Sequence, residues 1–132
     1  MTLKDFFKRD RFSLLAGIEL LEIGEGTARA RMLVTEQHLN GGDVCQGGAL
    51  FTLADLAFAA AVNSHLRLTV STSSNISFFR PVPVGHYVYA EASELVDHRR
   101  MPYAEVRLVD DEDHLVAIFT SSGYRKDVAI EL

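Results

Sequence analysis

The spacing of apolar and polar side chains predicts a short helix, a β-hairpin and a long apolar helix in the first half of the chain. Residues 2–15 put phenylalanines and leucines on one side of a helix and basic residues on the other. Residues 18–23 and 27–34 alternate with a period of two around a glycine-rich turn, which is typical of paired strands. Residues 47–66 read as a helix that is apolar on nearly every face, interrupted by the carboxylate of Asp55.

The second half of the chain predicts an antiparallel meander. Its β-rich segments are separated by turn residues and span 69–80, 85–96, 102–109 and 115–124. A curved sheet wrapped around one central helix satisfies this order, so we expect an α+β fold in a single domain, residues 1–132. A sheet covers only one face of the helix, so we expect a second copy of the chain to cover the other, in an isologous dimer.

Composition narrows the function classes. The 132 residues carry a net charge of -5, which gives no electrostatic reason to expect nucleic acid as a partner. The single cysteine, Cys45, excludes an internal disulfide and reads as a small buried residue. The charged N-terminus lacks the apolar core of a signal peptide, and no segment is suited to span a membrane, so we expect a cytoplasmic location. The five histidines lack metal-ligand spacing, so no metal is expected.

An ordered set of short motifs then carries a family resemblance. The set comprises Asn40, Gln46-Gly47-Gly48, Leu53-Ala54-Asp55 and the segment 75–81, NISFFRP. At these spacings the chain resembles the hotdog-fold acyl-CoA thioesterases, and their PaaI-like (phenylacetic acid degradation) branch in particular, over a core of about residues 15–125. The resemblance implies a hotdog fold that hydrolyses an aromatic or medium-chain acyl-CoA to the free acid and coenzyme A. It implies no cofactor, because coenzyme A is part of the substrate, and a dimer or dimer of dimers with composite active sites.

Gln46 departs from the family pattern, which usually has His before the glycine pair. The exchange removes a proton carrier and keeps hydrogen-bonding capacity. This weighs against a second function, a hotdog hydratase or dehydratase, whose chemistry uses a His with an acidic partner. A third function, non-catalytic binding of acyl-CoA, is favoured by the departure at Gln46 and opposed by the retention of Asp55.

Thioester hydrolysis requires a polarised carbonyl and an attacking group. Gly47 and Gly48 open the predicted helix, where N–H groups lack partners, although a glycine pair also suits close helix–sheet packing. Asp55 is expected to be the general base or the nucleophile, with a structural carboxylate bonded to hydroxyls as the alternative. Eight residues of helix separate Gly47 from Asp55 by ~12 Å, so the two groups are expected to meet across two chains.

The remaining candidates each have a structural alternative. Asn40 donates to the thioester or only forms a turn. A hydroxyl of Ser71, Thr72 or Ser73 positions water near the carboxylate, as the resemblance suggests, or merely packs in a strand. Phe58 belongs to the apolar wall that would take the acyl group. Four basic residues are candidates for binding the phosphates of coenzyme A: Arg80, His98, Arg99 and Arg100. The structural alternative is that they are only solvated charges in turns.

Overall fold

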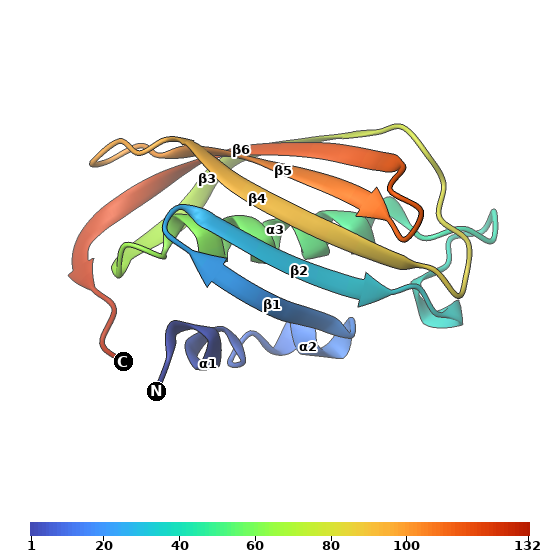
Figure 1. Ribbon diagram of the computed structural model, residues 1–132, viewed down its shortest axis with the longest axis horizontal. Coiled ribbons are helices and arrows are strands. Elements are labelled where there is room, and N and C mark those ends of the chain that lie inside the picture. Colours follow the sequence, from blue (N-terminus) through green and yellow to red (C-terminus); the bar gives the residue numbers. More distant parts are fainter.

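One curved antiparallel sheet wraps around one central helix in the computed structural model, which describes residues 1–132 (Figure 1). The helix is α3 (Gly47–Val62). The strands are β1 (Ile18–Gly24), β2 (Thr27–Leu33), β3 (Arg67–Phe78), β4 (Tyr87–Val96), β5 (Tyr103–Asp110) and β6 (Leu115–Ala129). Their spatial order is β1-β2-β4-β5-β6-β3, with every neighbouring pair antiparallel. This arrangement confirms the hotdog fold expected from the sequence.

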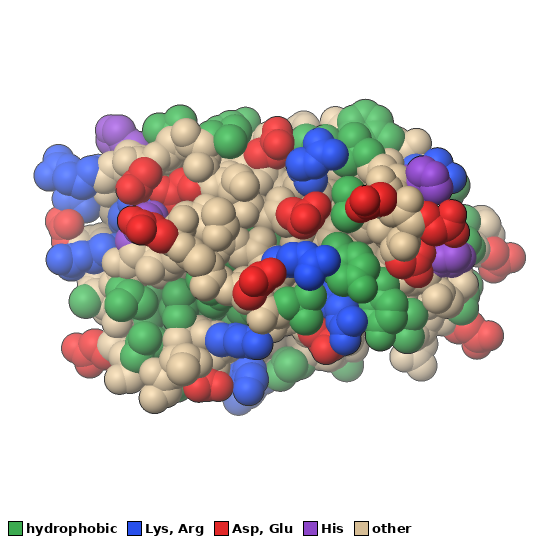
Figure 2. Space-filling model, viewed as in Figure 1, with side chains coloured by type: hydrophobic (Ala, Val, Ile, Leu, Met, Phe, Trp, Pro, Cys, Tyr) green, Lys and Arg blue, Asp and Glu red, His purple; other side chains and the backbone are tan.

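Small side chains let α3 lie close to the concave face of the sheet. Ala54, Ala57, Ala60 and Ala61 are fully buried on the helix. The helix contacts all six strands, so its apolar residues form one core with the inward-facing strand residues. The outer face of the sheet carries interspersed acidic and basic side chains rather than a continuous charged patch (Figure 2).

The N-terminal segment differs from the single helix predicted over residues 2–15. It forms two short helices, α1 (Leu3–Phe7) and α2 (Arg11–Leu15). The break occurs because Asp10 caps the second helix, its Oδ1 accepting the backbone N–H of Ser13 at 3.1 Å. Both helices lie alongside β1 and contact α3 (Figure 1). They cover part of the helix face that the sheet leaves open, which the sequence did not predict, and the second copy expected on this face stays a prediction.

The central helix is shorter than the predicted span of 47–66. It ends at Val62 because the side chain of Asn63 turns back to the next strand, accepting the N–H of Thr69 at 2.8 Å and donating to its carbonyl at 3.0 Å. Leu66 then adopts a left-handed conformation with φ of 63°, which no helix continues through. The strands begin and end within two residues of their predicted bounds, except that β6 runs five residues further, to Ala129, where it pairs with Arg67 of β3.

A stripe along α3 remains the least buried part of the helix. It consists of Gly48, Thr52, Asp55 and Ala59, spaced three to four residues apart and therefore on one face.

None of the helices combines the length and the apolar character that a membrane-spanning helix requires.

Candidate active site

The first two N–H groups of α3 have no acceptor within the chain. The carbonyl of Gln46 accepts the N–H groups of Ala49 and Leu50, at 3.0 and 3.3 Å, while those of Gly47 and Gly48 make no hydrogen bond. The turn before the helix is held firmly, because the N–H of Gln46 donates to the carbonyl of His38 at 2.7 Å. Two free donors at the positive end of a 16-residue helix make a ready site for a developing oxyanion.

The glycine pair also has a packing role. A Cβ on Gly47 would lie 2.8 Å from Cζ of Phe78, and a Cβ on Gly48 would lie 2.6 Å from Oε1 of Gln46. The Gln46 side chain therefore folds over Gly48 and makes no capping bond. The packing alternative is thus supported for Gly47, which gives room to the Phe78 ring. Its N–H is unpaired at the helix end, and a role in binding the oxyanion stays a prediction.

Asp55 has no hydrogen-bond or ion-pair partner in the chain. The structural alternative, a carboxylate satisfied by neighbouring hydroxyls, therefore lacks support in the single chain. The pKa of Asp55 is raised, first by burial and then by the negative charge of Asp10 at the start of α2. A half-buried carboxylate with no partner and a raised pKa has the properties of a general base.

Gly47 and Asp55 lie on one straight helix, eight residues apart. At 1.5 Å per residue this separation is ~12 Å along the axis, whereas groups acting on one carbonyl carbon need to be ~3 Å from it. A single chain therefore does not bring the two groups to the same carbonyl.

Asn40 forms the turn that was the structural alternative for it, and donation to the thioester stays a prediction. Its Oδ1 accepts the N–H groups of Gly42 and Val44, at 2.9 and 3.3 Å, which fixes the turn before the helix. The backbone N–H of Asn40 donates to the carbonyl of Val44 at 2.8 Å, whereas its side-chain Nδ2 makes no hydrogen bond within the chain, and the residue is exposed. The turn thus orients Asn40 with its donor free.

The hydroxyls of β3 do not contact Asp55 of the same chain. Ser71, Thr72 and Ser73 are exposed on a strand at the edge of the sheet. Thr72 lies at a bulge in the pairing with β6, and its Oγ1 lies 3.2 Å from the carbonyl and 3.0 Å from the hydroxyl of Ser122. A role beside Asp55 stays a prediction that requires a second chain.

Comparison with known proteins shows the family of the chain. Residues 42–117 match the model of the thioesterase superfamily. The chain is 34% identical over 123 residues to a putative esterase of Archaeoglobus fulgidus, covering 92% of this chain and 80% of the relative. It is also 34% identical over 119 residues to the acyl-coenzyme A thioesterase PaaI of Escherichia coli, covering 90% of this chain and 85% of that protein. The solved structure of E. coli PaaI superposes with a TM-score of 0.92 at 32% identity, covering 96% of this chain and 92% of that one.

The chain belongs to the thioesterase superfamily. It is a thioester hydrolase with a PaaI-like hotdog fold, as the sequence motifs implied. The family match covers the start of α3, Asp55 and β3, which are the elements that carry the candidate site.

The structure contradicts the prediction that Phe58 lines the acyl-binding wall. Phe58 is 1% exposed and packs against Phe119, with ring centroids 6.1 Å apart, so it is part of the core rather than of a substrate wall. The prediction failed because the sequence does not show which face of an all-apolar helix meets the sheet. Cys45 is buried as expected, and burial raises the pKa of its thiol to about 11.

The charged candidates occupy two places. Arg80 follows β3, and its Nε lies 3.8 Å from a carboxylate oxygen of Asp110. His98, Arg99 and Arg100 form the β4–β5 hairpin, at the end of the sheet away from the start of α3 (Figure 1). Arg100 is held by Asp127 at 2.6 Å, and the His98 ring accepts the N–H groups that follow it. Arg99 is exposed and unpaired, so coenzyme A binding by these groups stays a prediction.

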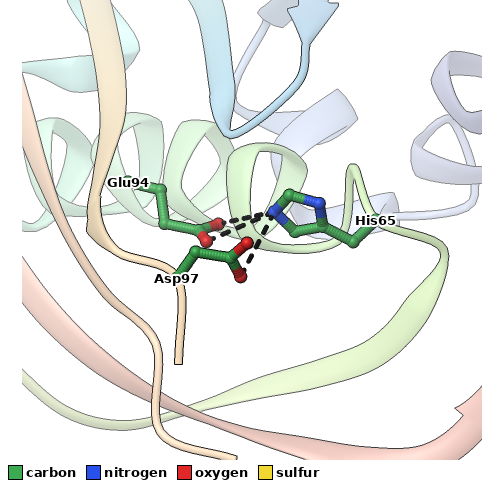
Figure 3. Close-up of side chains that lie close together, drawn as sticks. All are labelled: His65, Glu94 and Asp97. Carbon is green, nitrogen blue, oxygen red and sulfur yellow. Dashed lines mark hydrogen bonds and ion pairs between the residues drawn. The ribbon is translucent and has the colours of Figure 1, made fainter. Parts of the chain in front are cut away.

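A second cluster of ionisable groups lies near the C-terminal end of α3 (Figure 3). Nε2 of His65 lies 3.2 Å from the Glu94 carboxylate and 3.7 Å from Asp97. Their ligand atoms lie close enough to hold a metal ion, but Arg125 is already there, 2.8 Å from Asp97 and 3.6 Å from Glu94. Arg125 also donates to the carbonyl of Val62 at 3.1 Å. The cluster therefore fastens the β4–β5 hairpin to the helix end, with Arg125 supplying the positive charge.

Sequence reasoning missed Asp10 and His38, which both border the candidate site. The Asp10 side chain caps α2 and lies close enough to influence Asp55. The His38 ring accepts the N–H of Thr35 at 2.9 Å through Nδ1, which leaves Nε2–H to donate to the carbonyl of Ala16 at 2.6 Å. Asp is a favoured N-cap residue, so Asp10 could have been recognised as a helix cap, but no local pattern shows the long-range bond of His38.

Proposed function

We propose that this thioesterase hydrolyses acyl-CoA thioesters at composite sites formed by two copies of the chain. The free N–H groups of Gly47 and Gly48 would bind the carbonyl oxygen of the thioester, and Asp55 of the second copy would drive the attack. One observation carries the proposal: α3 presents an unpaired N-terminus and an unpartnered carboxylate ~12 Å apart on the same helix. The identity of 34% to the acyl-coenzyme A thioesterase PaaI supports the substrate class.

The edge strand β3 is the proposed interface. It has β6 as its only neighbour, is mostly exposed, and contains one charged residue, Arg67, in twelve. Unpaired strand edges with few charges favour pairing with another chain. Two-fold antiparallel pairing of β3 with its copy would lay the two α3 helices side by side in opposite directions. The end of one helix would then approach the middle of the other, where Asp55 lies.

In the proposed reaction a water oxygen attacks the carbonyl carbon while its proton passes to the Asp55 carboxylate. Negative charge develops on the carbonyl oxygen, and the N–H groups of Gly47 and Gly48 stabilise it. The C–S bond then breaks, the free acid forms, and the coenzyme A sulfur takes the proton. A second route replaces water by the carboxylate of Asp55, forms an anhydride and releases the same products after hydrolysis. One turnover in H₂¹⁸O with enzyme in excess separates the routes. Direct attack by water puts the label into the free acid, whereas an anhydride hydrolysed at the Asp55 carbon gives unlabelled acid and puts the label into Asp55.

Release of thiol from a panel of acyl-CoAs tests the proposed function. The wild-type protein is expected to cleave at least one member, and Asp55→Asn is expected to lower kcat by ~10²–10⁴, since it keeps the shape and removes the base. Glu91→Gln is the matched control, because Glu91 is an exposed carboxylate in the interior strand β4, away from α3. An Asp55→Asn protein with the wild-type kcat contradicts the role of Asp55. Hydration of an enoyl-CoA without thiol release would instead support the hydratase alternative.

A further inference from the structure

A groove of about 730 Å³ opens between α2 and the first turns of α3. Phe12 and Leu15 form one wall, and Gly48, Ala49 and Thr52 form the other. No Asp, Glu, Lys or Arg side chain lines it, whereas each of four other surface pockets, of about 490 to 840 Å³, is lined by at least three such residues. Six of its 13 lining residues are hydrophobic and the others include Thr35, Gln37 and Gln46, so the groove offers apolar surface and uncharged polar groups. Such a lining favours an uncharged ligand with an apolar part and penalises a charged one.

The α2 wall presents large apolar side chains to this groove. Phe12 is 65% exposed and Leu15 is 84% exposed, although α2 has only five residues. Leu33, at the end of β2, adds a further exposed apolar side chain to the lining. A ligand seated here would bury these side chains, and each buried methylene of the ligand would raise affinity about fourfold.

The two walls of the groove are fixed relative to each other through one residue. His38 donates from Nε2 to the carbonyl of Ala16, the C-terminal cap of α2, at 2.6 Å. The His38 carbonyl accepts the N–H of Gln46, the residue before α3, at 2.7 Å. The groove is therefore a built feature that joins α2 to the candidate oxyanion site.

We propose that Phe12 and Leu15 of α2 determine which acyl lengths this thioesterase accepts, because the end of the acyl chain lies against them in this groove. The inference rests on the proposed thioester hydrolysis. The groove is continuous with the candidate oxyanion site, because Gly48, whose N–H is free, is one of its lining residues. A thioester carbonyl bound to that N–H would therefore direct its acyl chain into the groove, toward Phe12 and Leu15. An acyl group that ends in a carboxylate would find no cation in the groove.

The specificity constants kcat/KM for butanoyl-, hexanoyl- and adipoyl-CoA test the proposal. Hexanoyl-CoA is expected to exceed butanoyl-CoA by roughly 16-fold, at about fourfold for each of two methylenes. Adipoyl-CoA has the same chain length as hexanoyl-CoA with a terminal carboxylate, and we expect a loss on the order of 100-fold. Equal cleavage of adipoyl- and hexanoyl-CoA would overturn the proposal.

Substitutions in α2 test the wall residues. Phe12→Ala and Leu15→Ala are expected to reduce the hexanoyl-to-butanoyl ratio at least threefold, because contact with the chain end is lost. Leu14→Ala is the matched control, since Leu14 lies on the same helix, is 55% exposed and lines a different pocket. An unchanged ratio in both groove variants would overturn the proposal. The proposal would also be overturned if the groove variants changed the oligomeric mass measured by sedimentation while the hexanoyl-to-butanoyl ratio stayed the same. Phe12 and Leu15 would then form a contact between copies of the chain.

Binding of S-hexyl-CoA, a thioether that cannot be hydrolysed, separates this inference from the proposed function. If no acyl-CoA is cleaved while S-hexyl-CoA binds and Phe12→Ala weakens that binding several-fold, the proposed function fails and the groove assignment stands. If acyl-CoAs are cleaved at rates independent of chain length and S-hexyl-CoA binds Phe12→Ala as it binds the wild type, the groove assignment fails and the proposed function stands.

Discussion

Gly47→Ala distinguishes the two roles of the glycine that opens α3. The added Cβ would lie 2.8 Å from Cζ of Phe78, so the ring or the helix start must move by at least about 0.6 Å to reach the 3.4 Å of an ordinary contact. Displacements of ~1 Å in a catalytic group cost up to ~10²-fold in rate, so we expect kcat to fall about tenfold. The free energy of unfolding is expected to change little. Strain of ~1 kcal/mol against the half-exposed ring is offset in part by the gain of alanine over glycine, which is ~1 kcal/mol in a helix interior and smaller at the first helical position, where residue 47 lies.

The double variant Gly47→Ala/Phe78→Ala completes this test. It relieves the contact and keeps the N–H of residue 47, so kcat is expected to return to within about threefold of the single variant Phe78→Ala. Thiol release at saturating acyl-CoA measures kcat, and urea unfolding measures stability. A double variant that stays as slow as Gly47→Ala would refute the reasoning, because the missing Cβ would then be required by the substrate itself and not by the Phe78 ring.

Three further predictions follow from burial and charge. Asp10→Asn keeps the cap of α2 and removes a negative charge that raises the pKa of Asp55. The pKa of Asp55 is therefore expected to fall, and the acid limb of the kcat/KM profile to move to lower pH. An acid limb that does not move contradicts the coupling between Asp10 and Asp55. Phe58→Ala should lower the free energy of unfolding by ~3–5 kcal/mol in a urea titration, because the ring is core; a loss under 1 kcal/mol would return Phe58 to a surface role. Cys45, with a pKa raised to about 11, should resist Ellman's reagent at pH 8 until the protein unfolds.

Local patterns were sufficient to predict the elements that carry the site. The Asn-Gly turn at Asn40, the Gly-Gly start of α3 and the lone carboxylate of Asp55 are all short-range signals, and the structure places them as predicted. The alternation of apolar and polar residues likewise predicted the antiparallel strands, because one face of such a sheet packs on the core and the other meets solvent.

Contacts between distant segments could not be predicted in this way. The helix is apolar all round, so the sequence did not reveal that Phe58 faces Phe119 while Asp55 faces outward. The bond from His38 to Ala16 and the approach of Asp10 to Asp55 depend on how the N-terminal helices fold back over α3. The break in the N-terminal helix depends on the single cap formed by Asp10. The free energy of one such cap is small, so the sequence alone does not decide between a capped second helix and one continuous helix.

The central claim is that each active site takes its oxyanion donors from one chain and its carboxylate from another. Mixing Asp55→Ala with Gly47→Val, each inactive alone, tests it directly after subunit exchange or refolding together. Half of the dimers are then mixed, and each has one site with both defects and one site with neither. The account predicts recovery of roughly a quarter of the wild-type activity. No recovery in proven mixed dimers would contradict it, as would an active monomer by sedimentation at micromolar concentration.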